Sequence, residues 1–293
     1  MKASVVIPAH NAADALPSLL RSLEAQTLGR DAFEVVVVDN ASTDTTAAVA
    51  ASGGARVVSE PRPSRARARN AGVGAALADR IAFVDAECEA DPGWLEALLR
   101  CLDRSPVVAG PVRLRLPATP SALERFDVLW RFHQREHVER DGWAASANLA
   151  VTRAAFDAVG GFDPAYHQIG EDVDLCLRAG AAGYALTRCP DAVVEHAAET
   201  ELRPVLRRSF EQAFALHDLH RKHGLRAGRY WRNPGPLVRG DWALRRFGVD
   251  PQALPTGERR AVLRVARGEY AARMAGSLWA PLRRHTTGFR SDE

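Results

Sequence analysis

Residues 33–39 read FEVVVVD, an unbroken apolar run that ends on an aspartate. A strand covered on both faces of a parallel sheet has this pattern, because neither of its faces meets water. The run ASVVIP at 3–8 has the same character and stops at Pro8. These two stretches predict two buried strands of one α/β sheet.

Helical periodicity follows each of these strands in the first hundred residues. One face of the first helix carries four leucines at helical spacing: Leu16, Leu19, Leu20 and Leu23. The further elements expected are a short helix after 41–44, a strand at 55–59, a helix near 65–78, a strand at 80–85 and a helix opened by Pro92. This alternation predicts right-handed crossovers and a doubly wound, mostly parallel Rossmann-like sheet flanked by helices.

The pattern loosens beyond residue 105. The elements expected there are a strand in 107–116, a helix at 121–139, a loop and strand at 142–152, a short helix at 154–162 and a helix at 171–182. One face of the last helix is predicted to hold Val173, Cys176, Leu177 and Gly180. From 201 onward the sequence is helical and basic, with a loop at 232–236.

Composition is that of a globular protein, with 46% hydrophobic and 26% charged residues among 293. No apolar stretch reaches the roughly 18 residues that a membrane span needs, and the N-terminus does not read as a signal peptide. The four cysteines form no CxxC pair, so we expect free buried thiols in a reducing compartment. These features predict a cytoplasmic protein, with peripheral contact at the inner face of the membrane as an option.

Charge is distributed unevenly along the chain. Residues 1–196 have a net charge of −6, and residues 197–293 have a net charge of +9. A basic tail suggests an anionic partner such as a membrane surface, a phosphorylated acceptor or nucleic acid, although a solvated arginine-rich surface explains it equally well. The helix expected at 258–279 is amphipathic, so it either lies on a membrane, packs on the catalytic domain or forms a homodimer. Nucleic acid is disfavoured because no aromatic stacking motif accompanies the charge.

Several acids occupy positions where chemistry is expected. Asp39 and Asp85 each end a predicted strand, and ligands of open α/β sheets bind at that edge. Asp85 and Glu87 lie two residues apart, so in an extended segment both point the same way and could hold a cation. The stretch GEDVD at 170–174 places three more acids in the first turn of a helix, where the helix dipole alone would explain them.

Taken together, the motifs resemble those of family 2 glycosyltransferases. They occur in the same order as in that family: VVIPAHN, VVVDNASTD, ARNAG, FVDAEC with DPGWL, SANLAVTRAAFDAVGGFD, GEDVDLCLRAGAAGY and VVEHA. The resemblance covers about residues 3–200. It implies a GT-A fold, a UDP-, dTDP- or GDP-sugar donor, a divalent metal (Mg²⁺ or Mn²⁺) and inversion at the anomeric carbon.

The resemblance also assigns nucleotide-binding residues. Pro8, Ala9 and Asp39 would line the nucleotide pocket, with Asp39 near the base or the ribose. Arg69 and Asn70 would lie at the nucleotide and its diphosphate.

Metal and catalytic roles follow from the later motifs. Asp85 and Glu87 match the metal-binding Asp-x-Asp, and His196 matches a third ligand. Glu87 departs from the commonest form of the motif, which puts the metal preference in doubt. Asp172 matches the base that takes a proton from the acceptor hydroxyl, and Glu171 would orient the site or bond the acceptor.

These assignments predict a catalytic domain at 1–200 and a basic helical extension at 201–293. The catalytic domain would comprise a nucleotide-binding half at 1–105 and an acceptor half at 106–200. The expected reaction is metal-assisted, non-processive transfer of one hexosyl or deoxyhexosyl unit. The acceptor would be a glycan, a lipid-linked molecule or a small molecule. The reaction would belong to cell-envelope or natural-product glycosylation. A sugar-nucleotide-binding protein with a degraded site and a nucleotidyltransferase remain as alternatives, the latter weakened because no glycine-rich basic loop is present to hold a triphosphate.

Overall fold

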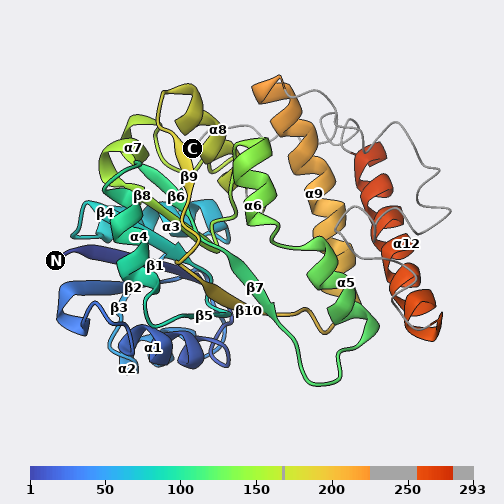
Figure 1. Cartoon of the computed structure of the whole chain (residues 1–293), viewed down its shortest axis with the longest axis horizontal. Coiled ribbons are helices and arrows are strands. Elements are labelled where there is room, and N and C mark those ends of the chain that lie inside the picture. Colours follow the sequence, from blue (N-terminus) through green and yellow to red (C-terminus); the bar gives the residue numbers. More distant parts are fainter. Residues whose placement is uncertain (167–168, 225–255, 280–293) are drawn as a thin grey trace. The chain divides into compact units, whose positions relative to one another are not determined.

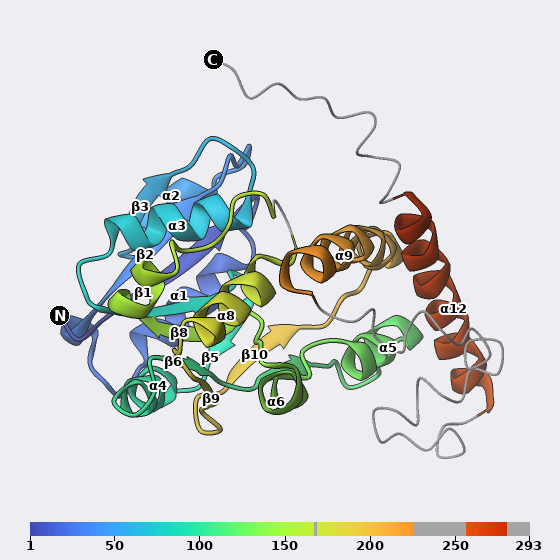
Figure 2. The same ribbon diagram turned by 90° about the horizontal axis from the view of Figure 1, so that it is seen from above.

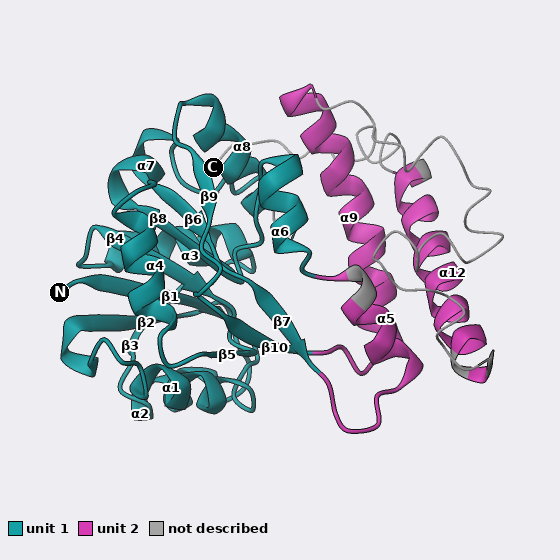
Figure 3. Ribbon diagram, in the orientation of Figure 1, with its two compact units in different colours: residues 1–115, 132–197 teal, residues 116–131, 198–293 magenta. Residues whose placement is uncertain are grey.

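The structure, a computed structural model, describes residues 1–166, 169–224 and 256–279. It divides into two compact units (Figure 3): unit 1 comprises residues 1–115 and 132–197, and unit 2 comprises 116–131 and 198–293. The predicted border at residue 200 lies near the third crossing between the units, after residue 197, but the sequence pattern did not separate 116–131 from the catalytic domain. The loop expected at 232–236 lies outside the described residues.

Unit 1 is built on a seven-stranded sheet with the order β3-β2-β1-β4-β8-β6-β9 (Figure 1). The strands are β1 (Ala3–Ala9), β2 (Phe33–Asp39), β3 (Arg56–Ser59), β4 (Arg80–Val84), β6 (Val107–Ala109), β8 (Asn148–Thr152) and β9 (Leu186–Arg188). Only β8 runs antiparallel to its neighbours in this sheet. The predicted mostly parallel α/β sheet is therefore confirmed.

A second sheet has the order β5-β10-β7 and consists of β5 (Cys88–Ala90), β10 (Val194–Ala197) and β7 (Val112–Arg115). The stretch 107–116 thus contributes β6 to one sheet and β7 to the other. Gly110 lies between them, and a Cβ atom there would come within 2.0 Å of the Ala192 carbonyl oxygen. The close approach of two backbones at Gly110 lets the chain change sheets.

Helices cover both faces of the large sheet. One core cluster contains side chains of α1 (Leu16–Glu24) and α4 (Trp94–Leu102), and the other contains side chains of α3 (Arg65–Ala75), α7 (Arg153–Ala158) and α8 (Glu171–Ala181). In the view of Figure 2, α3 and α4 lie on opposite sides of the strands. Strand β1 contributes side chains to both clusters, so its apolar run is continuous because both of its faces are covered, as predicted. The predicted leucine face of α1 is confirmed, because all four leucines are buried.

The helix predicted over 121–139 is interrupted. Its first part, α5 (Ala122–Trp130), ends at Trp130. Arg131 is then extended, and Phe132 adopts a left-handed conformation with φ 58°. A short α6 (Gln134–Glu136) and a π-helical turn (His137–Asp141) follow. The break turns Phe132 towards the core of unit 1, where its ring lies 5.1 Å from that of His196.

Unit 2 contains α5, α9 (Leu202–His223) and α12 (Thr256–Trp279). Side chains of all three helices form its core: Leu123, Phe126, Val205 and Val262. α12 thus packs on α5 and α9 of its own unit. Contact with a membrane and formation of a homodimer stay predictions. Among the residues described, no helix is both long and apolar enough to cross a bilayer.

The cysteine prediction is wrong for two of the four residues. Cys101 and Cys189 form a disulfide that joins the end of α4 to the segment after β9. Their separation of 88 residues gave no signal in the sequence, but the fold brings their Cα atoms to 6.1 Å, within disulfide range. Cys88 and Cys176 lie outside this disulfide and are buried, as predicted.

Candidate active site

Three strands of the large sheet end at one edge. The parallel register pairs Ala9 with Asp39 and Val6 with Phe83, so β1, β2 and β4 present their carboxyl ends together. Pro8, Asp39 and Asp85 are therefore brought to the same edge, as the strand pattern predicts. This edge is where open α/β sheets bind ligands.

The loops at this edge are joined by Asn40, which the sequence did not single out. Its Nδ2 donates to the carbonyl oxygens of Glu60 (2.9 Å) and Arg62 (2.8 Å), and its Oδ1 accepts the Ser64 amide (2.8 Å). Asn40 is buried, so each of these bonds is shielded from water. The loop after β2 is thereby held against the start of α3, and only its position after Asp39 could have signalled this role.

Asp39 is half-buried, and its Oδ1 accepts the backbone amide of Ser42 at 3.2 Å. The bond caps the turn that follows β2. A contact between Asp39 and a base or ribose stays a prediction, as does nucleotide contact by Pro8 and Ala9.

Arg69 lies on α3 and is only 2% exposed. Its Nη2 donates to Asp85 Oδ1 at 2.9 Å, and its Nη1 donates to Glu171 Oε1 at 2.6 Å. Burial alone would lower the pKa of Arg69, but the charges of Asp85, Glu171 and Asp172 raise it above its usual value. Arg69 therefore stays charged and connects the acid after β4 with the acids of α8.

Asn70, the next residue on α3, bonds the backbone of Phe162. Its Nδ2 donates to the Phe162 carbonyl at 2.8 Å, and its Oδ1 accepts the Phe162 amide at 2.9 Å. The side chain thus fixes the Gly-Gly turn, in which Gly160 and Gly161 have φ of 74° and 71°. The predicted contact of Asn70 with the nucleotide stays a prediction.

α8 begins at Gly170, which caps the helix with φ 100°, a value that favours glycine. Glu171 is buried directly behind it, and its Oε2 has no hydrogen-bond partner among the described residues. Burial and then the charge of Asp172 raise the pKa of Glu171 to about 7, against the lowering effect of Arg69. Glu171 is therefore a buried acid of the site whose pKa lies well above that of an ordinary glutamate.

Asp172 is half-buried, and backbone amides bond both of its carboxylate oxygens. Oδ2 accepts the Ser146 amide at 3.2 Å, and Oδ1 accepts the Val173 amide at 2.8 Å. One donor comes from the loop before β8 and the other from the first turn of α8. The two bonds hold the carboxylate of Asp172 in a defined orientation at the start of α8.

Asp174 differs from its description as an ordinary first-turn acid, because it is 0% exposed. Its Oδ2 accepts two bonds of 2.7 Å from the guanidinium of Arg178, which also donates to the carbonyl oxygens of Val159 and Gly161. Of the four residues predicted on one face of α8, Val173, Cys176, Leu177 and Gly180, only Cys176 is buried. The buried residues are Glu171, Asp174, Leu175, Cys176 and Ala179, because two ion pairs place acids on the inner side.

The predicted set of three metal ligands is not assembled. In the described parts of the chain, no group of three or more His, Cys, Asp or Glu side chains is arranged to hold a metal ion. Asp85 and Cys88 close a tight turn through a 3.0 Å bond between the Cys88 amide and the Asp85 carbonyl, so the segment is not extended. The alternation that would align Asp85 with Glu87 is lost, and Glu87 is exposed.

Two of the three predicted ligands, Asp85 and His196, lie close enough for the charge of His196 to act on Asp85. β10 pairs with β5 so that His196 lies opposite Cys88, near Asp85. Burial would raise the pKa of Asp85, but the charges of Arg69, Arg65 and His196 hold it below its usual value. The Nδ1 of His196 lies 2.7 Å from the Ala197 carbonyl oxygen, the bond that metal-binding histidines commonly make with their second nitrogen.

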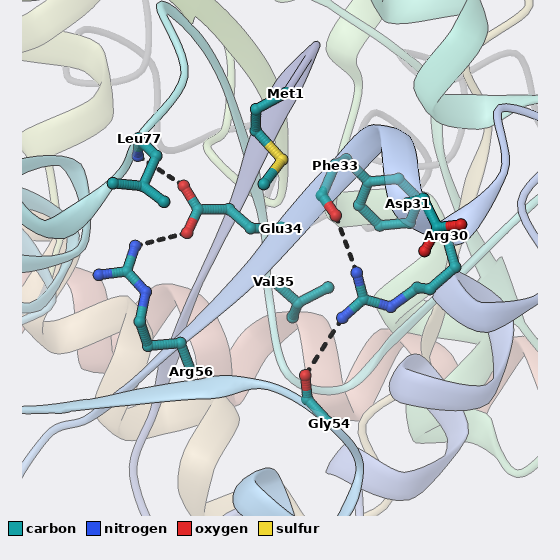
Figure 4. A pocket seen from close by; sticks show the side chains of 9 residues that line it. All are labelled: Met1, Arg30, Asp31, Phe33, Glu34, Val35, Gly54, Arg56 and Leu77. Atoms are coloured by element: carbon teal, nitrogen blue, oxygen red, sulfur yellow. Dashed lines mark hydrogen bonds and ion pairs between the residues drawn. The ribbon is translucent and has the colours of Figure 1, made fainter.

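A hollow of about 390 Å³ lies at the start of β1 and β2, away from their carboxyl ends (Figure 4). Its charged groups bond one another: Glu34 accepts from Arg56 and from the Leu77 amide, and Arg30 donates to the carbonyls of Phe33 and Gly54. These bonds join the starts of β2 and β3 with the loops beside them.

Comparisons with known proteins agree with the fold and the motifs. The profile of glycosyl transferase family 2 matches residues 4–121. The chain is 30% identical to glycosyltransferase AglE of Haloferax volcanii over 203 residues, 67% of this chain and 66% of that protein. It is 33% identical to the pre-mycofactocin glycosyltransferase of Mycobacterium tuberculosis over 220 residues, 71% of this chain and 45% of that protein. The matches therefore span less than two thirds of these two relatives.

A third relative is covered more fully. An uncharacterized glycosyltransferase of Mycobacterium tuberculosis is 34% identical over 186 residues, 62% of this chain and 80% of that protein. Among solved structures, a mannosyltransferase from Pyrobaculum calidifontis in complex with GDP-Man and Mn²⁺ has a TM-score of 0.64 at 20% identity, covering 96% of this chain and 87% of that one. That similarity shows the GT-A fold. From its fold, its ordered motifs and these relatives, the chain belongs to glycosyl transferase family 2.

Proposed function

We propose that this glycosyltransferase moves one sugar from a nucleotide diphosphate sugar to an acceptor hydroxyl, with inversion at the anomeric carbon. The observation that supports it most is the double ion pair of Arg69. Through it, Asp85 at the end of β4 and the acids that begin α8 belong to one buried network. A donor bound at the strand ends would thus meet a base at the helix start.

Asp172 is the proposed base. It takes the proton of the acceptor hydroxyl while that oxygen attacks the anomeric carbon and the nucleotide diphosphate departs from the opposite face. The amides of Ser146 and Val173 hold its carboxylate in place. A single displacement of this kind inverts the configuration at the attacked carbon.

We propose Asp85 and His196 as the protein ligands of a divalent cation, with Glu87 outside the ligand set. Such an ion would neutralise charge on the departing diphosphate. Two protein ligands alone bind Mg²⁺ or Mn²⁺ weakly, and substrate phosphates commonly complete such a site. We expect Mn²⁺ to bind tightly only with UDP or GDP present, as measured by calorimetry, and D85N to remove that gain. Equal Mn²⁺ affinity with and without nucleotide would contradict the assignment.

The transferase proposal is tested with a panel of UDP-, GDP- and dTDP-sugars, each with and without Mn²⁺. Release of nucleoside diphosphate together with a glycosylated acceptor is the expected result. Donor binding without release under any acceptor would favour a sugar-nucleotide-binding protein. Release of pyrophosphate from a nucleoside triphosphate would favour a nucleotidyltransferase.

Asp172→Asn is the matching variant. It keeps the size of the side chain but cannot take up a proton, so we expect transfer to fall by about 1000-fold, within the range attributed to acid–base catalysis. Donor affinity should stay within about twofold, since the change does not touch the strand ends. Normal turnover by this variant would remove Asp172 from the mechanism.

Unit 2 supports a proposal about the acceptor side. Arg260, Arg264 and Arg267 follow one another at helical spacing on α12, and all three are exposed. We propose that this row contacts an anionic surface, such as the membrane that carries a lipid-linked acceptor. Glycan and small-molecule acceptors are the alternatives, and one relative is named for pre-mycofactocin.

A further inference from the structure

The buried Arg69 is bonded differently from Arg178, a half-buried arginine of α8. Its guanidinium forms no bond to a backbone carbonyl in the described structure and pairs only with Asp85 and Glu171, which belong to different motifs. Its Nε atom is buried and has no hydrogen-bond partner among the described residues. Arg69 therefore leaves bonding capacity unused, and its two ion pairs are its only polar contacts in the described structure.

The guanidinium is held from a third side by an aromatic ring. Its central carbon lies 5.6 Å from the centre of the Phe162 ring, within cation–π range. That ring packs edge-on against Phe83 of β4 at 5.2 Å, and Asn70 fixes the Phe162 backbone through two hydrogen bonds. The position of Arg69 is thus determined by the sheet and by the Gly-Gly turn before α8.

Arg178 provides a comparison from within the chain. It pairs with a single acid, Asp174, and donates to the carbonyl oxygens of Val159 and Gly161. All these groups stabilise the packing of α8 on the turn before it. An arginine whose role is to hold the fold together is bonded in this way.

We propose that Arg69 is a positioning residue, which holds the acids of α8 at a fixed distance from the strand-end site. This inference rests on the proposed transfer reaction and deepens it. Arg69 need not touch donor or acceptor: it acts through Glu171, the neighbour of Asp172, and through Asp85. A base held at fixed separation from the bound donor supplies the orientation that a displacement requires.

Arginine is required for this role because its planar fork donates along two directions at once. Lysine keeps the positive charge but presents a single ammonium group on a flexible stem. Arg69→Lys should therefore preserve much of the electrostatic balance among the buried acids while losing the link between them.

The experiment compares R69K with R178K as its matched control. Both change a partly or fully buried arginine to lysine next to α8, so both should lower the thermal midpoint. We expect R69K to reduce kcat by about 100-fold while KM for the donor changes less than about threefold. We expect R178K to keep kcat per folded molecule within about threefold of the wild-type value. Equal kcat for R69K and wild type would overturn the inference, and so would equal losses in R69K and R178K.

E171Q adds a second test that does not depend on the folding of R69K. The amide keeps the shape of Glu171 but weakens its pairing with Arg69, so kcat should fall while donor affinity persists. If Arg69 acts through Glu171, the R69K/E171Q double variant should lose little more than R69K alone. Wild-type turnover by E171Q, or losses that multiply in the double variant, would contradict the mechanism.

Failure of the proposed transfer reaction and failure of the positioning role of Arg69 give different results. A wild-type chain that releases no nucleoside diphosphate with any donor would overturn the proposed function and the inference together. A wild-type chain that turns over, alongside an equally active R69K, would overturn the inference alone.

Discussion

Glu171 is buried between a cation and a second acid, and burial raises its pKa to about 7 from an ordinary value of 4.5. In the unfolded chain this acid gives up its proton near pH 4.5, but the folded chain retains it until about pH 7. The folded state therefore binds more protons in this window, and stability falls as pH rises through it.

We expect wild-type protein to lose about 3 kcal/mol of unfolding free energy relative to E171Q between pH 4.5 and pH 7.5. Glutamine has no proton to release, so the variant lacks this contribution. Urea denaturation at a series of pH values measures the difference. Parallel pH profiles for the two proteins would show that Glu171 titrates normally.

Asp174 separates stability from chemistry at the same helix start. Asp174→Asn leaves the Arg178 guanidinium without its counter-charge, so we expect a loss of about 3 kcal/mol in unfolding free energy. Turnover per folded molecule should be unchanged, because Asp174 lies on the inner side of α8. Urea denaturation and initial rates on the same preparations measure the unfolding free energy and the turnover. D172N should show the opposite result, with stability kept and turnover lost.

At the scale of elements, the disulfide joins α4 to the segment between β9 and β10. Cross-linking residues 88 apart restricts the unfolded chain, which stabilises the native state by about 2–4 kcal/mol. C101S/C189S should therefore unfold at lower urea concentration. Alkylation of the denatured, unreduced protein followed by mass spectrometry should label two thiols, those of Cys88 and Cys176. Reductant should destabilise wild type and leave the double variant unchanged, and four labelled thiols in wild type would contradict the bridge.

The start of α8 depends on one glycine. Gly170 has φ 100°, where any other residue is strained, and it determines where the chain enters the helix. We expect Gly170→Ala to cost roughly 1–2 kcal/mol in stability. It should also lower kcat, because the turn carrying Glu171 and Asp172 must shift. Gly183, also at positive φ but beyond the end of the helix, is the control position: G183A should cost stability alone.

At the scale of the whole molecule, positive charge is concentrated in one unit. The segment 197–293 carries a net charge of +9, and α12 exposes a row of three arginines. We expect the protein to sediment with vesicles containing anionic phospholipid but not with neutral ones, and less so as salt rises. Each arginine contributes about 1 kcal/mol near such a surface.

The triple variant R260E/R264E/R267E should therefore lose vesicle binding and keep its thermal midpoint. A control triple at Arg21, Arg100 and Arg104, which are exposed in unit 1, should still bind. Binding that survives the change on α12, or that disappears equally in the control, would assign the contact to another surface.

The sequence by itself determined the sheet and its ligand-binding edge. Continuous apolar runs occur where both faces of a sheet are covered, so the local sequence predicted β1 and β2. Helices repeat with a different period from strands, so the spacing of the leucines predicted the buried face of α1. The acids at strand ends followed from the same logic, since parallel strands end together. Ordered motifs then indicated the family.

Only the tertiary structure decided what surrounds each acid. Glu171, Asp172 and Asp174 look alike in sequence, yet one is buried against Arg69, one is bonded to amides and one is paired with Arg178. The tight turn after Asp85 removed the alternation that would align it with Glu87, and the Cys101–Cys189 bridge joined residues far apart in the chain. Charge state, ligand geometry and disulfide pairing depend on neighbours supplied by distant segments, and local spacing carries no information about those neighbours.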